Sequence, residues 1–507
     1  MSNALKRLLA ALVFAGIPLL YFSFLPVSYN FDGTVFSQML RYALLKRNWL
    51  DMVQIHHLAY FPLNYLAYRI LAALFKYRVL EFFHLQMFSL FFGAATLLLV
   101  ERTLKKLGQA LELRVIGVSL VAFSYAFWQF AVDAEVHIPG LFFTLAGIYL
   151  LVFRKATIWP LVGAAFCFAA AAGFHLTNIL IAATVLLYLL CQRAPWRRFA
   201  EFYLSYAGFM LLMYGAYSAL ARQPVLGVLR SVLFGADRYS GYHIPYSRPL
   251  SWTTLRLSLR SVQAALVAGG GVPAGLVLAA ALFLVLPGLR REAGEERRLF
   301  RRAMLLWALP FFVFFSFWDP GNMEFKIHVV VPLLLLASAS LSRLAPAAAA
   351  ALGATLAAAL LWINLSTGIR PQTEIAANVN YQVAQSIRRL TPANSLILIT
   401  GSFAGYGYGK IYIPYFAGRE VLILDWLLGK GHSLPEIGAA LAGRAENGQP
   451  VYTLDEIALP GKALPGVLDF HKVGKKDLAL FAGAIRFVPV AALPGADHLY
   501  RLEFRTP

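Results

Sequence analysis

Residues 115–153 read VIGVSLVAFSYAFWQFAVDAEVHIPGLFFTLAGIYLLVF, with two apolar runs on either side of a short polar stretch. The runs 115–130 and 138–153 are each close to the length with which a helix crosses a bilayer. Between them lie Asp133, Glu135 and His137. Ionisable groups beside membrane helices are costly and usually serve a function. The stretch therefore predicts two membrane spans joined by a turn that carries a candidate site.

The composition of the whole chain agrees with a multi-pass membrane protein. Of 507 residues, 59% are hydrophobic and 14% are charged, and the mean hydropathy is +0.64, which is too apolar for a soluble protein of this length. The net charge of +20 comes mainly from short loops between apolar runs, the pattern that keeps loops in the cytoplasm. We therefore expect membrane lipids, and no nucleic acid, as partners. The two cysteines, Cys167 and Cys191, predict neither a disulfide framework nor a zinc site.

The apolar runs predict about eleven transmembrane helices, with the N-terminus inside and the C-terminus outside. Residues 28–77 have an amphipathic and interrupted pattern that suits helices lying in the outer interface. A long outer loop is expected over 221–263. The predicted spans are 8–27, 80–100, 115–130, 138–153, 159–173, 176–190, 199–220, 264–286, 303–318, 329–341 and 347–365.

The composition changes at about residue 369. The runs SLILIT (395–400) and VLILD (421–425) are typical of buried strands, and 450–454 predicts a third strand. Helical patterns over 378–390 and 434–444 alternate with these strands. We therefore expect a transmembrane domain over 1–368 and a small α/β domain, outside the membrane, over 369–507.

Several polar residues are predicted to share the outer face with the Asp133–His137 turn. Asp32 follows the first span and could act as a general base, because a carboxylate near the surface can accept a proton from an acceptor hydroxyl or amine. Purely structural interpretations are also open for these polar residues. Asp32 could be a turn residue, Glu135 and His137 could form a polar helix end, and His175 could be a turn histidine. Other groups expected on this face are His57, Asn178, Asp319, Glu324 and Lys326.

The predicted outer loop 221–263 is rich in arginine and tyrosine, against the usual charge bias. Arg238 and Arg248 could bind phosphate or lipid headgroups through their guanidinium groups, with Tyr242 and His243 nearby. A plain solvated interfacial loop is the other interpretation. The stretch 133–137 could contribute to a Mg²⁺ or Mn²⁺ site, but one short cluster does not establish it.

In order and sidedness, these features resemble the GT-C superfamily of membrane glycosyltransferases, and most closely its protein O-mannosyltransferase-related branch. Residues 57–64, HLAYFPLN, resemble the branch's HPPGYPLY segment but lack two of its prolines. Residues 128–137, WQFAVDAEVH, resemble its WxxxAxxAEVY stretch, with His137 in place of tyrosine. Residues 174–178, FHLTN, match its next outer turn. The likeness covers roughly residues 1–365.

The resemblance implies an inverting transfer of a sugar from a polyprenyl-phosphate donor, on the extracytoplasmic face of a bacterial plasma membrane. Asp32 would be the general base and Glu135 a second catalytic residue. The acceptor stays open among protein, lipid and glycan. Expected substrate-binding residues are His57, Asp133, His137, His175, Asn178, Tyr242, His243, Asp319 and Glu324, and expected lipid-phosphate-binding residues are Arg238, Arg248 and Lys326.

A transporter or lipid flippase is the alternative, because charges beside membrane helices also mark transport paths. The sequence shows no inverted repeat and no matching pair of glycine- or proline-broken helices, which transporters commonly have. The acidic residues also gather at one predicted surface. Both features favour the enzyme.

Overall fold

The computed structural model describes residues 3–46, 49–50, 53–154, 157–234, 251–285, 294–400, 409–458, 481, 483–495 and 497–504. They form two compact units. The first comprises Met1–Pro26, Met39–Ala236 and His243–Thr373, and the second comprises Val27–Gln38, Asp237–Tyr242 and Glu374–Pro507.

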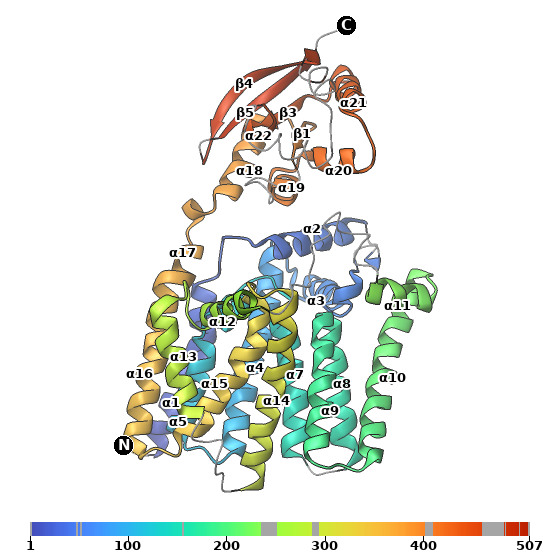
Figure 1. The fold of residues 1–507 in the computed structure, drawn as a ribbon. Helices are drawn as coiled ribbons and strands as arrows, with labels where there is room; N and C mark the ends of the chain where they lie inside the picture. The colour runs from blue at the N-terminus through green and yellow to red at the C-terminus, as the bar shows by residue number, and fades with distance from the viewer. Residues whose placement is uncertain are drawn as a thin grey trace. The chain divides into compact units, whose positions relative to one another are not determined.

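The first unit is a bundle of helices (Figure 1). Helix α2 (Phe31–Lys46) belongs to the second unit up to Gln38 and to the first unit beyond it. The other helices of the bundle are α1 (Asn3–Ser23), η2 (Ile55–His57), α3 (Tyr60–Phe75), α4 (Glu81–Lys106), α5 (Leu111–Ala122), α6 (Tyr125–Val132), α7 (His137–Phe153), α8 (Ile158–Phe174), η3 (Leu176–Leu180), α9 (Ile181–Cys191), α10 (Trp196–Ala221), α11 (Val225–Phe234), α12 (Trp252–Leu266), α13 (Gly271–Val285), α14 (Glu295–Trp318), η6 (Glu324–Lys326), α15 (Ile327–Leu341), α16 (Pro346–Asn364), η7 (Leu365–Ile369) and α17 (Arg370–Gln372).

The prediction of a multi-pass helical membrane protein is confirmed. Among the described residues, six helices are long and apolar enough to cross a membrane, or up to eight if each of two bent helix pairs is one span. Three shorter apolar helices, α7, α8 and the continuous η3–α9 segment, lie among them and would complete the predicted eleven. Helices α2 and α3, with 16 residues each, lie in the region predicted to be interfacial.

Two of the predicted apolar runs, 115–130 and 264–286, contain a sharp break between two helices. Helices α5 and α6 meet at 70°, and α12 and α13 meet at 88°. The predicted span 115–130 therefore ends at Ala122 and resumes at Tyr125. The second break has a local cause, because Gly269, Gly270 and Gly271 all have positive φ angles, a conformation that glycine adopts without steric cost.

The predicted outer loop 221–263 also contains helices that the sequence did not indicate. Helices α11 and α12 occupy much of it. Helix α12 begins with a capping box, in which Ser251 Oγ accepts from Thr254 N at 3.2 Å and Thr254 Oγ1 accepts from Ser251 N at 2.9 Å. Such reciprocal bonds satisfy backbone donors that a helix start otherwise leaves unpaired.

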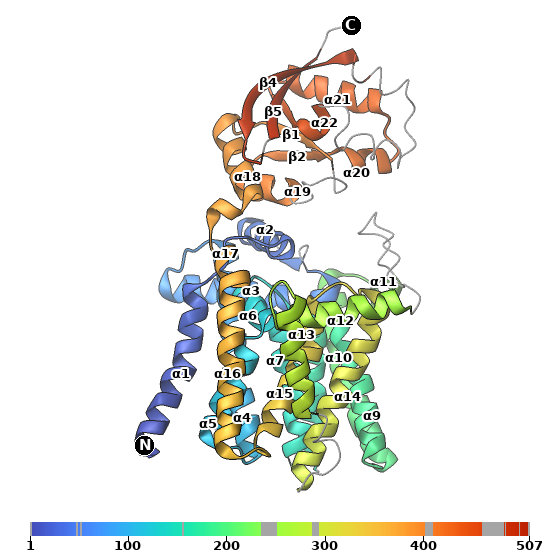
Figure 2. The same ribbon diagram turned by 60° about the vertical axis from the view of Figure 1, so that its left-hand side comes forward.

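The second unit is built on a five-stranded sheet of order β2-β1-β3-β5-β4, and its strands lie side by side in Figure 2. Strands β1 (Leu396–Ile399), β2 (Glu420–Ile423) and β3 (Val451–Leu454) are parallel, whereas β5 (Asp497–Phe504) runs antiparallel to β3 and to β4 (Ile485–Leu493). The helices of this unit are η8 (Ile375–Ala377), α18 (Val379–Leu390), α19 (Gly409–Tyr412), η9 (Ile413–Ala417), α20 (Leu424–Gly429), α21 (Leu434–Glu446) and α22 (Asp455–Ala458).

Strand β1 is buried on both faces, which explains why apolar and polar residues do not alternate in its sequence. Ile397 and Ile399 pack into one apolar core, and Leu396 and Leu398 pack into another. A strand that is covered on both faces reads as a continuous apolar run. The expected α/β unit is thus confirmed, with β4 and β5 added.

Candidate functional site

The polar turn between α6 and α7 is buried and internally bonded. Asp133, Glu135 and His137 have exposed fractions of 2%, 3% and 5%. Asp133 Oδ1 accepts from Ala134 N at 2.8 Å, and the Glu135 amide donates to the Asp133 carbonyl at 3.0 Å. The hydroxyl of Ser89, on α4, donates to the Glu135 carbonyl at 3.1 Å. These bonds fix the backbone of the turn, so the two carboxylates occupy defined positions.

Tyr60 lies against this turn, although the sequence did not single it out. It is the first residue of α3 and is buried. Burial raises the pKa of its phenol well above the ordinary value, and the carboxylates of Glu135 and Asp133 raise it further. A phenol that stays protonated beside two carboxylates can donate a hydrogen bond to them or to a bound hydroxyl. The only signal in the sequence was its place in the 57–64 segment.

Three histidines from separate segments pack together next to the turn. The rings of His57 and His175 are 5.0 Å apart, and those of His137 and His175 are stacked at 5.2 Å. His57 Nδ1 lies 3.0 Å from the Phe174 carbonyl oxygen, so this nitrogen is the donor. His175 Nδ1 accepts from Thr177 N at 3.2 Å. The structure thus brings together three of the predicted substrate-binding residues.

The imidazoles of this cluster are held in their neutral form. Burial lowers the pKa of His57 to about 4, opposed by its bond to the Phe174 carbonyl. Burial also lowers the pKa of His175 well below its ordinary value, and the neighbouring histidines lower it further. A neutral imidazole has one donor and one acceptor nitrogen. The cluster can therefore bind hydroxyl groups without adding positive charge.

The loop between α14 and α15 reaches the same place. Glu324 Oε2 lies 3.8 Å from His137 Nε2 and accepts from Asn322 Nδ2 at 3.2 Å. The ring of Phe325 lies 5.7 Å from the rings of both His137 and His175. Glu324 was predicted to share the site with His137, and the structure brings the two together.

Lys326 ends this loop and is completely buried, with an exposed fraction of 0%. Its Nζ donates to the Phe315 carbonyl at 3.2 Å and lies 5.7 Å from the centre of the Phe315 ring. His328 follows on α15, buried and stacked on Phe311 with ring centres 4.4 Å apart. The sequence did not single out His328, because a lone histidine in an apolar run carries no local signal.

Two other predicted residues, Asn178 and Asp319, have different surroundings. Asn178 is buried and donates from Nδ2 to the Ala171 carbonyl at 2.9 Å. It lies so close to Gly140 that a Cβ there would come within 2.6 Å of Asn178 Nδ2. Asp319 is the C-terminal cap of α14 and is partly buried, and its carboxylate raises the pKa of Lys326 against the larger, lowering effect of burial.

Asp32 lies in the first turn of α2, within the part of that helix that belongs to the second unit. The helix start is bonded by Asn30, whose Oδ1 accepts from Gly33 N at 2.6 Å. The Asp32 side chain is exposed, but the protein around its carboxyl still removes water, and this desolvation raises its pKa. Since Asp32 and Glu135 fall in different units, their pairing in one site stays a prediction.

The remaining predicted residues, Arg238, Tyr242, His243 and Arg248, lie outside the described residues. Their roles stay predictions. Within the described ranges, no group of three or more His, Cys, Asp or Glu residues is placed to hold a metal ion. The suggestion that this turn contributes to a Mg²⁺ or Mn²⁺ site stays a prediction.

The fold is similar to those of solved membrane proteins, although no protein-family model and no curated protein matches the chain. ArnT from Cupriavidus metallidurans bound to undecaprenyl phosphate matches with a TM-score of 0.63 at 11% identity, covering 99% of this chain and 98% of ArnT. Its apo state matches with a TM-score of 0.63 at 12% identity and the same coverage. The arabinofuranosyltransferase AftD from Mycobacteria matches with a TM-score of 0.57 at 14% identity, covering 98% of this chain and 40% of AftD. The chain has a GT-C-like fold with a small C-terminal sheet unit. The narrower resemblance to the O-mannosyltransferase-related branch stays a prediction.

Proposed function

We propose that this protein is a membrane glycosyltransferase that takes a sugar from a polyprenyl-phosphate donor. The observation that carries the proposal is the buried cluster of two carboxylates and neutral imidazoles, which is reached by the loop that ends in the buried Lys326. This cluster lies in a fold similar over nearly its whole length to ArnT, a protein solved with undecaprenyl phosphate bound. Buried ionisable groups gathered in one place are typical of a reaction site.

The proposed reaction is an inverting transfer. The acceptor oxygen or nitrogen attacks the anomeric carbon and loses its proton to the Asp32 carboxylate. The bond between the anomeric carbon and the phosphate oxygen breaks, and the polyprenyl phosphate leaves with the electron pair. Lys326, Arg238 and Arg248 stabilise the charge of that phosphate, as fixed cations do at a leaving group.

The groups around the Asp133–His137 turn orient the sugar in this proposal. The carboxylates of Asp133 and Glu135 accept hydrogen bonds from sugar hydroxyls. The neutral rings of His57, His137 and His175 can each donate to or accept from a hydroxyl. We place this reaction on the extracytoplasmic face of a bacterial plasma membrane.

The test is a transfer assay with the purified full-length chain and a panel of polyprenyl-phosphate sugars, in which released lipid phosphate is measured. We expect Asp32→Asn to lower turnover roughly 10²- to 10⁴-fold, the usual contribution of a general base. Glu135→Gln should lower it as well. Lys105→Met, at an exposed position at the far end of α4, is the control and should retain turnover. Equal turnover in Asp32→Asn and the parent would remove Asp32 as the base.

A transporter or flippase is the second candidate, and the two bent helix pairs favour it, since discontinuous helices are common in transporters. The same purified chain, reconstituted into lipid vesicles that contain the donor, separates the two functions. A flippase moves an intact lipid-linked sugar across the membrane, whereas a transferase releases lipid phosphate. Movement of the intact donor without release of phosphate, for every sugar tested, would replace the enzyme by the flippase.

A further inference from the structure

Asn364, the last residue of α16, makes three hydrogen bonds in the interior of the bundle. Its exposed fraction is 0%. Its Nδ2 donates to the carbonyl of Phe123 at 2.7 Å and to that of Leu266 at 2.9 Å, and its Oδ1 accepts from Ala268 N at 2.8 Å. One amide group thus uses both of its donor hydrogens and its acceptor.

The three backbone groups bonded by Asn364 belong to the two broken helix pairs. Phe123 is the C-terminal cap of α5, before α6 turns away by 70°. Leu266 ends α12, and Ala268 lies in the link to α13, where the bend is 88°. Helix ends leave carbonyl and amide groups without intrahelical partners, and such groups are costly in an apolar interior. Asn364 satisfies groups at both breaks at once and so ties them together.

Further residues after Asn364 contact the same two helix breaks. At Gly368, an added Cβ would come within 2.4 Å of Tyr125 Cε2 and 2.6 Å of Ala268 Cβ. Gln372 Nε2 donates to Tyr125 Oη at 2.9 Å. Asn364, Gly368 and Gln372, which we call the Asn364 clamp, therefore hold the start of α6 as well as the link between α12 and α13.

Each of the two breaks leads to one half of the candidate site. Helix α6 ends at Val132 and is followed directly by the Asp133–His137 turn. Helix α12 holds the other half, because Ser261 Oγ donates to the Pro320 carbonyl at 2.6 Å, in the loop that leads to Glu324 and Lys326. The 3.8 Å approach of His137 to Glu324 thus joins two segments whose supporting helices are both fixed by the clamp.

We infer that Asn364 is a positioning residue, which sets the spacing between the Asp133–His137 turn and the Asp319–Lys326 loop. Its effect on catalysis rests on the proposed function, but the spacing itself can be measured without any activity.

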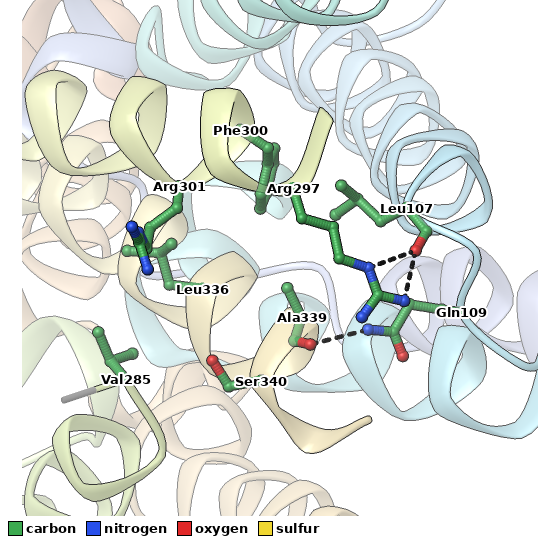
Figure 3. A pocket seen from close by; sticks show the side chains of 9 residues that line it. All are labelled: Leu107, Gln109, Val285, Arg297, Phe300, Arg301, Leu336, Ala339 and Ser340. Carbon is green, nitrogen blue, oxygen red and sulfur yellow. Dashed lines mark hydrogen bonds between the residues drawn. The ribbon is translucent and has the colours of Figure 1, made fainter. Parts of the chain in front are cut away.

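A matched control lies at another position in the bundle, shown in Figure 3. Gln109 is a buried amide whose Nε2 donates to the Ala339 carbonyl at 2.9 Å, beside Arg297, which donates to the Leu107 carbonyl. It borders a cavity of about 10 Å³, which is room for no more than about one water molecule. Replacing Gln109 with leucine removes a buried amide–carbonyl bond at a position that touches neither helix break. Asn364→Leu removes three buried bonds, all of them at the breaks.

The experiment measures the spacing by chemical cross-linking. Cysteines replace His137 and Glu324 in a full-length chain whose Cys167 and Cys191 are serine, and a short bifunctional methanethiosulfonate reagent joins them. The rate of cross-linking is followed in this parent and after adding Asn364→Leu, Gln372→Leu or Gln109→Leu. Thermal unfolding in the same detergent reports the stability of each variant.

We expect Asn364→Leu to slow cross-linking at least about tenfold, which corresponds to about 1.4 kcal/mol in the barrier, while Gln109→Leu, which removes fewer hydrogen bonds, keeps the parent rate. Gln372→Leu removes only the bond to Tyr125 and should slow cross-linking less. If Asn364→Leu does not fold, the cross-linking rate of Gln372→Leu tests the positioning role in its place. Parent rates in the folded clamp variants, or equal slowing by Gln109→Leu, would overturn the positioning role. Because no sugar transfer is measured, these outcomes do not depend on whether the protein is a glycosyltransferase.

Discussion

Lys326 offers a test that separates function from stability. Its ammonium group is fully buried and has one hydrogen bond, to the Phe315 carbonyl at 3.2 Å, and it lies 5.7 Å from the centre of the Phe315 ring. The Asp319 carboxylate also favours its charged form. A residue kept for stability should be costly to remove. A residue kept to bind a lipid phosphate should be cheap to remove from the free protein but costly for binding. The substitution Lys326→Met keeps the length of the side chain and removes the charge.

The magnitudes follow from these contacts. Burying an ammonium group costs several kcal/mol even in real protein interiors. The charged hydrogen bond returns about 1.5–3 kcal/mol, and the ring contact returns about 2 kcal/mol when it is desolvated. These gains roughly cancel the cost, so we expect Lys326→Met to change the free energy of unfolding by less than about 1.5 kcal/mol, compared with about 2–5 kcal/mol for truncating a buried aliphatic side chain.

Binding of the lipid phosphate should respond much more strongly. Losing one charge-assisted bond of about 1.5–3 kcal/mol weakens affinity roughly 10- to 150-fold. Ligand at 100 times its Kd stabilises a protein by about 2.7 kcal/mol, and a hundredfold loss of affinity would leave about 0.4 kcal/mol of that stabilisation.

The assay is thermal unfolding of the purified protein in detergent, with and without undecaprenyl phosphate. Lys326→Met should unfold near the parent temperature without lipid and lose most of the shift that lipid produces. Lys105→Met, at an exposed position, should keep the whole shift. If Lys326→Met lost more than about 3 kcal/mol of stability and kept the full lipid shift, the lysine would be structural and the assignment would be refuted.

Two further predictions concern stability. The pKa of His57 is lowered to about 4 in the folded protein, so its contribution to stability is present above about pH 6.5, the ordinary value, and is lost as the pH falls from there towards 4. His57→Asn should therefore reduce the slope of the unfolding temperature against pH over this interval. An unchanged slope would contradict the lowered pKa. At Gly147 an added Cβ would lie 2.4 Å from Phe168 Cε1, so Gly147→Ala should cost about 1–3 kcal/mol through overpacking of α7 on α8. Gly215→Ala, where a Cβ would meet no atom within 4 Å, is its control in the same thermal assay and should be neutral or stabilising by up to about 1 kcal/mol; equal unfolding temperatures for both variants would rule out the close contact.

Much of the fold could be predicted because its signals are local. The apolar runs fixed most helix positions to within a few residues: 138–153 became His137–Phe153, and 159–173 became Ile158–Phe174. The three short apolar or β-branched runs after residue 390 became β1, β2 and β3. Strands β4 and β5 were not predicted, because each contains both buried and exposed residues and so has no continuous apolar run.

The candidate site was predicted only in part, for the same reason. Acidic residues beside apolar runs are conspicuous, so the Asp133–His137 turn and Glu324 were found from the sequence. Tyr60 and His328 were missed, because an aromatic or histidine in an apolar run looks like ordinary core. The structure distinguishes them by their neighbours: the carboxylates beside Tyr60 and the histidines beside His328.

The sequence by itself determined that this is a membrane bundle with a polar turn at 133–137 and a small sheet unit, because hydrophobicity and charge act on each segment separately. Only the tertiary structure decided where two spans break and which residue closes the breaks. Asn364 and Phe123 are 241 residues apart, and a lone asparagine at the end of an apolar run carries no sign of its partners. Whether a backbone group left open by a bend can be satisfied depends on the helix packed against it, and that packing exists only once the chain has folded.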